Sequence, residues 1–316
     1  MKLVAVVGPT ASGKSALALH LAATFDGEII SCDSTAVYRG IDIGTDKLAE
    51  RDRRGIPHHL IDVVGPTETY SAAQYAAAAA AAAREIAGRG RLPILAGGTG
   101  FYYRALVRGL FPGPARDEAL RARLDAVAAR RGTESLHRWL TRVDPESARR
   151  IQPRDRKRLV RALEVYLLTG RALTEHFAGT TSPIAGALVL TVGISMPRPW
   201  LRERVAARVD AQFARGVVAE VRQLLAAGVP ATAHAFSGLV YRQVIEFLQG
   251  RRDETATREL IVRENMRYAR RQLIWFRKEP HVRWIAGPGE SGGAFQEAES
   301  IVREFVTSGH VGDSGH

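Results

Sequence analysis

The sequence is poor in cysteine and has no long apolar run. Its one cysteine among 316 residues, Cys32, excludes an internal disulfide and a cysteine-based zinc site, and it fits a reducing, cytoplasmic environment. No apolar stretch approaches the roughly 20 residues that span a bilayer. The first residues run directly into a strand pattern, so we expect neither a membrane anchor nor a signal peptide. With 46% hydrophobic and 25% charged residues, the composition is that of a soluble globular protein.

Acidic residues are scarce relative to basic ones. Lysine and arginine number 45 against 33 aspartates and glutamates, which gives a formal net charge of +12. Such an excess indicates an acidic partner, and it favours a nucleic acid over an anionic membrane surface. The alternative is a proteome rich in arginine and alanine, in which many enzymes are basic.

The chain does contain a phosphate-binding motif near its start. An apolar strand pattern at residues 3–7 precedes this motif, and a helix pattern follows it to about Ala23. Backbone N–H groups at such a helix start form an anion site, to which a lysine adds positive charge and a serine hydroxyl a ligand for Mg²⁺. The motif predicts a bound phosphate and leaves the reaction open. Its residues are Gly8, Pro9, Thr10, Ala11, Ser12, Gly13, Lys14 and Ser15.

Strand and helix patterns alternate along much of the chain. Apolar strands are expected at 28–32, 92–96, 188–194 and 281–285. Helices are expected at 70–87, bounded by Ser71 and Gly88, and at about 198–227 and 254–278. This alternation predicts an α/β fold with a parallel sheet of the P-loop NTPase type, which binds ligands at the carboxyl ends of its strands.

The composition changes after the sequence FPGP at 111–114. From there to about Gly186 the chain is helical in pattern and rich in arginine, with helix starts and ends indicated at Asp144, Asp155, Gly132 and Gly170. We therefore predict a discontinuous catalytic core of residues 1–112 and 187–306. An inserted all-helical domain occupies 113–186, and a disordered tail occupies 307–316.

Two polar residues follow predicted strands at the ligand-binding edge. Asp33 follows strand 28–32, and Thr99 follows strand 92–96 within a run of glycines. A carboxylate at this place can hold a metal or accept a proton, and a turn or helix-capping role for Asp33-Ser34 fits equally well. Because the strand at 92–96 ends in Gly-Gly-Thr rather than a magnesium-binding Asp, nucleotide hydrolysis is less favoured.

Two stretches concentrate positive charge. Residues 149–161 carry six arginines and Lys157 against a single aspartate, and residues 263–278 interleave arginine with Tyr268, Trp275 and Phe276. Basic side chains neutralise phosphates and aromatic rings stack on splayed bases, which is typical of RNA-binding surfaces. The alternatives are a solvated helix face for the first stretch, and for the second a helix whose aromatics enter the core while its arginines face solvent. We expect the latter for 263–278. The adjacent His58 and His59 cannot share one face as a metal pair, and Cys32 is expected to be a buried strand residue.

Taken together, these motifs resemble the bacterial tRNA dimethylallyltransferase family, also called tRNA isopentenyltransferases. The matching segments run in the family order and cover nearly the whole chain. Two departures stand out: Thr35-Ala36 replaces the Met-Gln of many members, and Val240 stands where a glycine usually precedes Tyr241. The matching segments are GPTASGKS (8–15), IISCDSTAVYRGIDIGTDK (29–47), PHHLID (57–62), YSAAQY (70–75), PILAGGTGFYYRAL (93–106), RLVRALEVYLLTGR (158–171), RVDAQF (208–213), VYRQ (240–243) and RYARRQLIWFR (267–277).

The resemblance implies a magnesium-dependent transferase, and a monomer is the default expectation for its oligomeric state. Its phosphate loop would hold the diphosphate of dimethylallyl diphosphate, and the acceptor would be N6 of adenosine 37, beside the tRNA anticodon. Asp33 would take the N6 proton, Thr99 would orient Asp33 and the flipped base, and Lys14, Arg208 and a Mg²⁺ near Ser15 would stabilise the departing diphosphate. The residues that match tRNA-binding positions are Asp33, Ser34, Thr35, Ala36, Thr99, Arg121, Lys157, Arg158, Leu159, Val160 and Arg161.

Three other functions remain open from the sequence. A relative that prenylates free AMP, ADP or ATP would use the same pocket but would not need a basic insertion. A P-loop small-molecule kinase would transfer phosphate from ATP. A non-catalytic RNA-binding protein could keep the loop as a relic, although the presence of Lys14, Ser15 and Asp33 argues against it.

Overall fold

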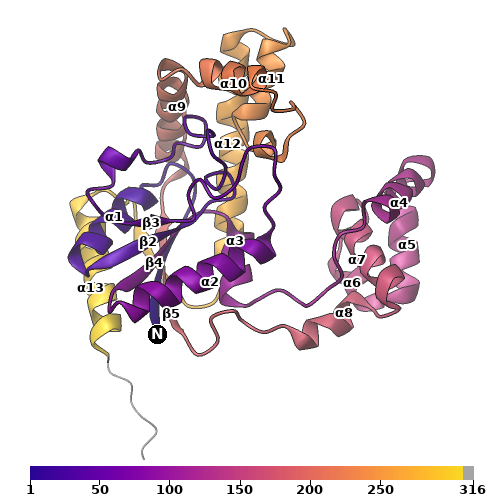
Figure 1. Ribbon diagram of the computed structural model, residues 1–316, viewed down its shortest axis with the longest axis horizontal. Helices are drawn as coiled ribbons and strands as arrows, with labels where there is room; N and C mark the ends of the chain where they lie inside the picture. The colour runs from indigo at the N-terminus through magenta and orange to yellow at the C-terminus, as the bar shows by residue number, and fades with distance from the viewer. Residues whose placement is uncertain (309–316) are drawn as a thin grey trace, which may run out of the picture. The chain divides into compact units, whose positions relative to one another are not determined.

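A computed structural model describes residues 1–308 of the chain, which form two compact units (Figure 1). The first unit comprises Met1–Val107 and the described residues from Ile184 onward, and the second comprises Arg108–Pro183. The predicted tail begins inside a helix, because Thr307 is the last residue of α13 (Gly292–Thr307), and residues 309–316 lie outside the described residues.

The first unit is built on one parallel six-stranded sheet, ordered β3-β2-β4-β1-β5-β6. The α/β parallel fold expected from the alternating patterns is confirmed. The short edge strand β3 was not expected. The strands are β1 (Lys2–Val7), β2 (Gly27–Cys32), β3 (His58–His59), β4 (Leu92–Gly97), β5 (Leu188–Ser195) and β6 (Val282–Ala286).

Helices cover both faces of this sheet because successive strand residues point to opposite sides. Alternate residues of β1 separate two apolar clusters: Val4 and Val6 pack with α1 and α13, whereas Leu3, Ala5 and Val7 pack with α2, α3 and the later helices. The helices of this unit besides α13 are α1 (Lys14–Thr24), α2 (Ala72–Gly88), α3 (Gly100–Val107), α9 (Arg198–Ala214), α10 (Val217–Ala226), α11 (Tyr241–Leu248) and α12 (Glu254–Phe276), with 3-10 turns at Glu50–Asp52 and His234–Ser237.

The prediction of a single helix at about 198–227 is wrong, because the structure has two helices there. Gly216 adopts a left-handed conformation with φ of 91° between α9 and α10 and turns the chain. The alanine-rich α2 begins where its sequence indicates, because the Ser71 side chain accepts a bond from Gln74 N–H and the Gln74 side chain accepts one from Ser71 N–H.

The second unit is entirely helical. Asp144 and Asp155 cap the helices that follow them, and Gly132 and Gly170 lie at helix ends, as their positions in the sequence predict. Its own apolar cluster includes Leu124, Leu136, Leu140, Leu159 and Leu163. Its helices are α4 (Glu118–Arg131), α5 (Thr133–Val143), α6 (Pro145–Arg150), α7 (Arg156–Thr169) and α8 (Leu173–His176), followed by a 3-10 turn at Phe177–Gly179.

Candidate functional site

The phosphate-binding motif lies between β1 and α1, at the carboxyl edge of the sheet. Gly13 adopts a left-handed conformation with φ of 89° and its carbonyl accepts the first helical bond from Leu17 N–H. A Cβ at Gly13 would also collide with Gly289 and Glu290, because the segment after β6 packs on the loop and Gly289 N–H donates to Ser12 O at 2.9 Å. The first N–H groups of α1 are thus presented to an anion.

Lys14 is the first residue of α1, and its side chain reaches back to the phosphate loop. Its ammonium donates to Pro9 O at 2.6 Å. Loss of hydration, and then the nearby charge of Arg208, lower the pKa of Lys14 from 10.5 to about 8, against the opposing effect of Asp33. A polyanionic ligand bound beside Lys14 would therefore strongly favour its protonated, positively charged form.

Two arginines of α9 fix the loop from the side. Arg208 donates to Thr10 Oγ1 at 3.0 Å and to Thr45 O at 3.1 Å, and it pairs with Asp46. One turn earlier, Arg204 donates to Ala11 O at 2.7 Å. The structure therefore brings Arg208, predicted from the sequence at a distance of almost 200 residues, to the phosphate loop.

Asp33 lies immediately after β2, and its neighbours hold its carboxylate. Oδ1 accepts from Thr35 N at 2.8 Å and from Thr35 Oγ1 at 2.6 Å. Thr99 Oγ1 accepts from Ser34 N at 3.1 Å, and Thr99 N donates to Cys32 O at 3.1 Å. Thr99 thus fixes the backbone that follows Asp33, and Thr35, which the sequence suggested only as a tRNA contact, orients the carboxylate itself.

These groups meet in one pocket of the first unit. Its lining joins an anion-binding end (Thr10, Lys14, Ser15, Arg208) to the carboxylate of Asp33 and to an apolar part. Ala36, also predicted at the site, is buried and lines the pocket. The apolar part includes Ala18, Ile29, Leu48, Ile61 and Ala96. A ligand with an anionic end and a short hydrocarbon end matches such a lining.

Two pocket residues on α12 were missed as site residues. Tyr268 lines the pocket, and burial, with Asp33 nearby, raises the pKa of its hydroxyl to about 12, so it stays a phenol. Gln272 lies one helical turn later, is buried, and lines the same pocket. The spacing of four residues in RYARRQ places both on one helix face, which is the signal the sequence offered.

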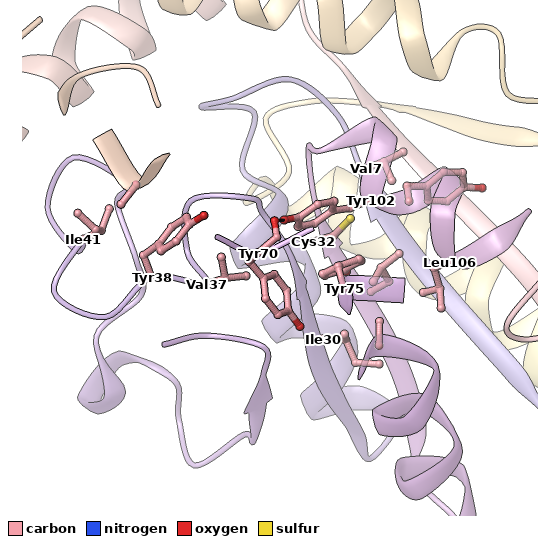
Figure 2. Packing of buried hydrophobic residues seen from close by; sticks show 14 of the residues in the cluster. Val7, Ile30, Cys32, Val37, Tyr38, Ile41, Tyr70, Tyr75, Tyr102 and Leu106 are labelled. Atoms are coloured by element: carbon pink, nitrogen blue, oxygen red, sulfur yellow. Dashed lines mark hydrogen bonds between the residues drawn. The ribbon is translucent and has the colours of Figure 1, made fainter. Parts of the chain in front are cut away.

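Burial settles the role of Cys32, whereas His58 and His59 are both half-buried. Cys32 lies in the apolar cluster beside Tyr75 and Tyr102, whose rings stack at 4.0 Å (Figure 2). Burial raises the pKa of its thiol to about 12, which keeps it protonated and inert. His59 contacts Glu28 at 2.7 Å, and residues 1–308 contain no group of three acidic, histidine or cysteine side chains that could hold a metal by themselves.

The basic side chains of residues 263–278 are exposed, whereas Phe276 is buried and Trp275 is half-buried. The expectation that the aromatics of this stretch enter the core is confirmed for Phe276 and in part for Trp275, whereas Tyr268 lines the pocket instead. Arg104 of α3 covers the Trp275 ring at 5.8 Å. The exposed residues of this stretch are Arg263, Arg267, Arg270, Arg271, Arg277 and Lys278.

In the helical unit, Arg121 and Arg161 share one buried carboxylate. Glu164 Oε1 and Oε2 accept from Arg121 at 2.8 and 2.9 Å, and Oε2 also accepts from Arg161 at 2.6 Å. Lys157 and Arg158 are exposed on the same helix. Leu159 and Val160 are buried in the apolar cluster, so their side chains offer nothing to a ligand outside.

We expect Glu164→Gln to destabilise the helical unit by about 3 kcal/mol at pH 7, because it leaves two arginines around a neutral group. These arginines hold the pKa of Glu164 at about 2 despite its burial. Since the folded pKa lies below the unfolded value of 4.5, the stabilisation is complete above pH 4.5 and is lost as the pH falls toward 2.

The measurement is urea unfolding of the full chain, followed by hydrogen exchange in α4 and α7. The control is Glu146→Gln, which removes a half-exposed carboxylate paired with Arg150 and should cost less than about 1 kcal/mol. Equal losses in the two variants would contradict the assignment of a buried carboxylate that holds both arginines.

A parallel sheet with a glycine-rich loop between its first strand and helix defines a P-loop α/β protein. The family model of IPP transferases matches residues 36–279, and the chain belongs to this family. It is 47% identical to a tRNA dimethylallyltransferase of Solibacter usitatus over 97% of this chain and 99% of the relative, and 46% identical to one of Thermomicrobium roseum over 98% and 94%.

Solved structures give the same result. The chain is similar to a tRNA isopentenylpyrophosphate transferase of Bacillus halodurans with a TM-score of 0.70 and 35% identity, covering 96% of this chain and 95% of the other. It is also similar to a eukaryotic dimethylallyltransferase described as acting on tRNA, with a TM-score of 0.78, 25% identity and coverage of 96% and 79%. Within residues 1–308, none of the helices has the length and apolar character that a membrane crossing requires.

Proposed function

We propose that this protein transfers the dimethylallyl group of dimethylallyl diphosphate to N6 of adenosine 37 in tRNA. Relatives at 46–47% identity over nearly the full length carry the name tRNA dimethylallyltransferase. The observation that carries the proposal is the single pocket that combines a phosphate loop, an oriented carboxylate and an apolar lining. The phosphate loop matches a leaving diphosphate, the carboxylate of Asp33 matches an amine that must lose a proton, and the apolar lining matches a five-carbon chain.

In the proposed reaction, N6 attacks the allylic carbon, the bond from that carbon to the diphosphate oxygen breaks, and its electron pair leaves with the diphosphate. Asp33 accepts the proton from N6. This amine is a weak nucleophile because its lone pair is delocalised into the ring, so a positioned base matters. Lys14, Arg208 and the N–H groups of the loop stabilise the charge that develops on the leaving group. The adenine must leave the anticodon-loop stack, which costs a few kcal/mol.

The lining of the pocket fits a magnesium ion. Ser15 presents a hydroxyl oxygen there, and Mg²⁺ keeps several waters while taking its remaining ligands from a bound phosphate. When bound, the ion would neutralise part of the diphosphate charge. We also propose that the enzyme is monomeric and cytoplasmic; the single free cysteine supports only the reducing compartment.

The direct test is incubation with Mg²⁺, dimethylallyl diphosphate and transcribed tRNA, followed by mass spectrometry of the nucleosides. We expect one added five-carbon unit on the adenosine beside the anticodon. A competition between AMP and an unmodified anticodon stem-loop distinguishes tRNA modification from prenylation of free nucleotides. Phosphate transfer from ATP to a small molecule, without prenyl transfer, would overturn the proposal in favour of a kinase.

Binding of the anticodon stem-loop should weaken steeply with salt, because exposed basic residues displace counterions from phosphates. With about four phosphate contacts, the affinity should fall roughly 50- to 150-fold between about 50 and 200 mM salt. Fluorescence anisotropy measures this slope. Replacing both Lys157 and Arg158 by alanine should make the salt dependence shallower, by the equivalent of about one to two phosphate contacts. Alanine at the half-buried Arg121 would also perturb folding, because Arg121 pairs with Glu164. A slope near zero would contradict a basic RNA-binding surface.

A further inference from the structure

Gln272 joins two loops that both line the pocket: the phosphate loop after β1, and the loop that follows the neighbouring strand β4. Its Oε1 accepts from Thr10 N in the phosphate loop at 2.8 Å, and its Nε2 donates to Gly98 O at 3.0 Å. The side chain is buried, so these bonds are shielded from water. A Cβ at Gly98 would collide with Nε2 of Gln272, and the glycine therefore permits the close approach.

Each of the two loops carries a different part of the proposed chemistry. Thr10 also accepts a bond from Arg208, which belongs to the diphosphate end. Gly98 precedes Thr99, whose hydroxyl holds the backbone after Asp33. The amide of Gln272 thus links the phosphate loop to Gly98, and the adjoining Thr99 links that segment to Ser34, the residue after Asp33.

We propose that Gln272 is a positioning residue that sets the distance between the diphosphate cradle and the base. The inference rests on the proposed function. A carboxamide is suited to this place because one end must accept from an N–H and the other must donate to a carbonyl. The leaving oxygen, the allylic carbon and N6 must be aligned for transfer, and a misplacement of about 1 Å costs on the order of 10²-fold in rate. Because the amide of Gln272 bonds to Thr10 N and Gly98 O of the protein itself, we expect its loss to lower the transfer rate more than the affinity.

The test uses Gln272→Met in the full-length protein, a substitution of similar length without an amide. We expect single-turnover transfer to tRNA to fall at least about 30-fold, while the dissociation constant of inorganic pyrophosphate changes less than about 5-fold. Gln243→Leu is the matched control. Gln243 is equally buried and accepts from Val240 N, a bond inside its own helix start, so its loss should affect stability and leave the transfer rate within about threefold of wild type.

Hydrogen exchange distinguishes a positioning role from a merely structural one, because a purely structural role would leave the pyrophosphate-induced protection unchanged. In the wild type, pyrophosphate should slow exchange at the N–H groups of Ser34 and Thr99 as well as in residues 8–15. In Gln272→Met, protection should persist in the loop and disappear at Ser34 and Thr99. If Gln272→Met does not fold, Gln272→Glu serves instead, because it keeps an acceptor for Thr10 N–H and lacks the donor for Gly98 O.

Transfer within threefold of wild type, or pyrophosphate-induced protection retained at Ser34 and Thr99, would overturn the role of Gln272. These outcomes are separate from a failure of the proposed function. If the wild type does not prenylate tRNA, the exchange experiment with pyrophosphate still reports whether Gln272 connects the two loops.

Discussion

Asp33→Asn slows prenyl transfer by about 10²–10⁴-fold while the affinity for the anticodon stem-loop stays close to wild type. This is the expected range for the loss of a positioned base. The substitution is nearly isosteric, and an amide oxygen can still accept from Thr35 N and Thr35 Oγ1, which now hold Oδ1 of Asp33. The site should therefore keep its geometry and lose its ability to take the N6 proton.

The measurement is a single-turnover experiment with saturating donor, which separates chemistry from product release. Asp26→Asn is the control, because Asp26 is an exposed carboxylate that directly precedes the first residue of β2, at the end of the strand away from Asp33. It should transfer at the wild-type rate. A wild-type single-turnover rate in Asp33→Asn would remove Asp33 from the mechanism, and an equal loss in both variants would indicate a general effect on β2.

The phosphate loop and Asp33 could be predicted from the sequence because their positions depend on local pattern. A glycine loop between a strand and a helix places Lys14, and the end of an apolar strand places Asp33, once the sheet is parallel. Tyr268 and Gln272 could not be placed in this way. Both lie more than 230 residues after Asp33, and their contact with the pocket depends on where α12 packs against the sheet.

Backbone conformation limited the prediction elsewhere. Gly216 lies inside a pattern that is helical on both sides, and only its left-handed conformation reveals the break between α9 and α10. Val240 shows the reverse case. It has φ of 83°, a region that disfavours β-branched residues, and this explains why a glycine usually occupies the position before Tyr241. The resemblance pointed to this position, and the structure shows the backbone conformation that Val240 has to adopt there.

The stretch at 157–161 shows why a motif match does not make every residue a ligand contact. Leu159 and Val160 match positions of a tRNA-binding motif, yet helix periodicity turns both side chains into the apolar cluster of the helical unit. Lys157 and Arg158 remain outside. The exposed basic residues therefore carry the electrostatic part of the motif, and the buried ones hold the helix that presents them.

Lys14→Met abolishes most donor-dependent activity and at the same time stabilises the free protein at pH 7. The activity falls because a partly desolvated ammonium beside the leaving group contributes on the order of 10²–10³-fold to stabilisation of the developing charge. The stability rises because the folded state no longer has to keep a desolvated ammonium beside Arg208. An increase of a few °C in the unfolding midpoint of the first unit is expected.

The pH dependence tests this explanation. The pKa of Lys14 is about 8 in the folded protein and 10.5 when unfolded, so the unfolded chain binds more protons between these values. Wild-type stability therefore rises with pH across this window. The advantage of Lys14→Met should be full below about pH 8 and should vanish toward pH 10.5. A constant difference, or a less stable variant at pH 7, would contradict the lowered pKa.

Ligand binding should reverse the shift. The charge of pyrophosphate favours the ammonium form of Lys14. At pH 8.5 about three quarters of Lys14 is neutral before binding, so the wild type should take up about 0.75 proton more per pyrophosphate bound than Lys14→Met does. Calorimetry in two buffers of different ionisation enthalpy measures this difference. The same ammonium destabilises the free protein and binds the polyanion. Lys14→Met should therefore raise the stability, lower the affinity for pyrophosphate and remove the proton uptake together. A loss of activity with unchanged affinity and unchanged proton uptake would place Lys14 outside the phosphate site.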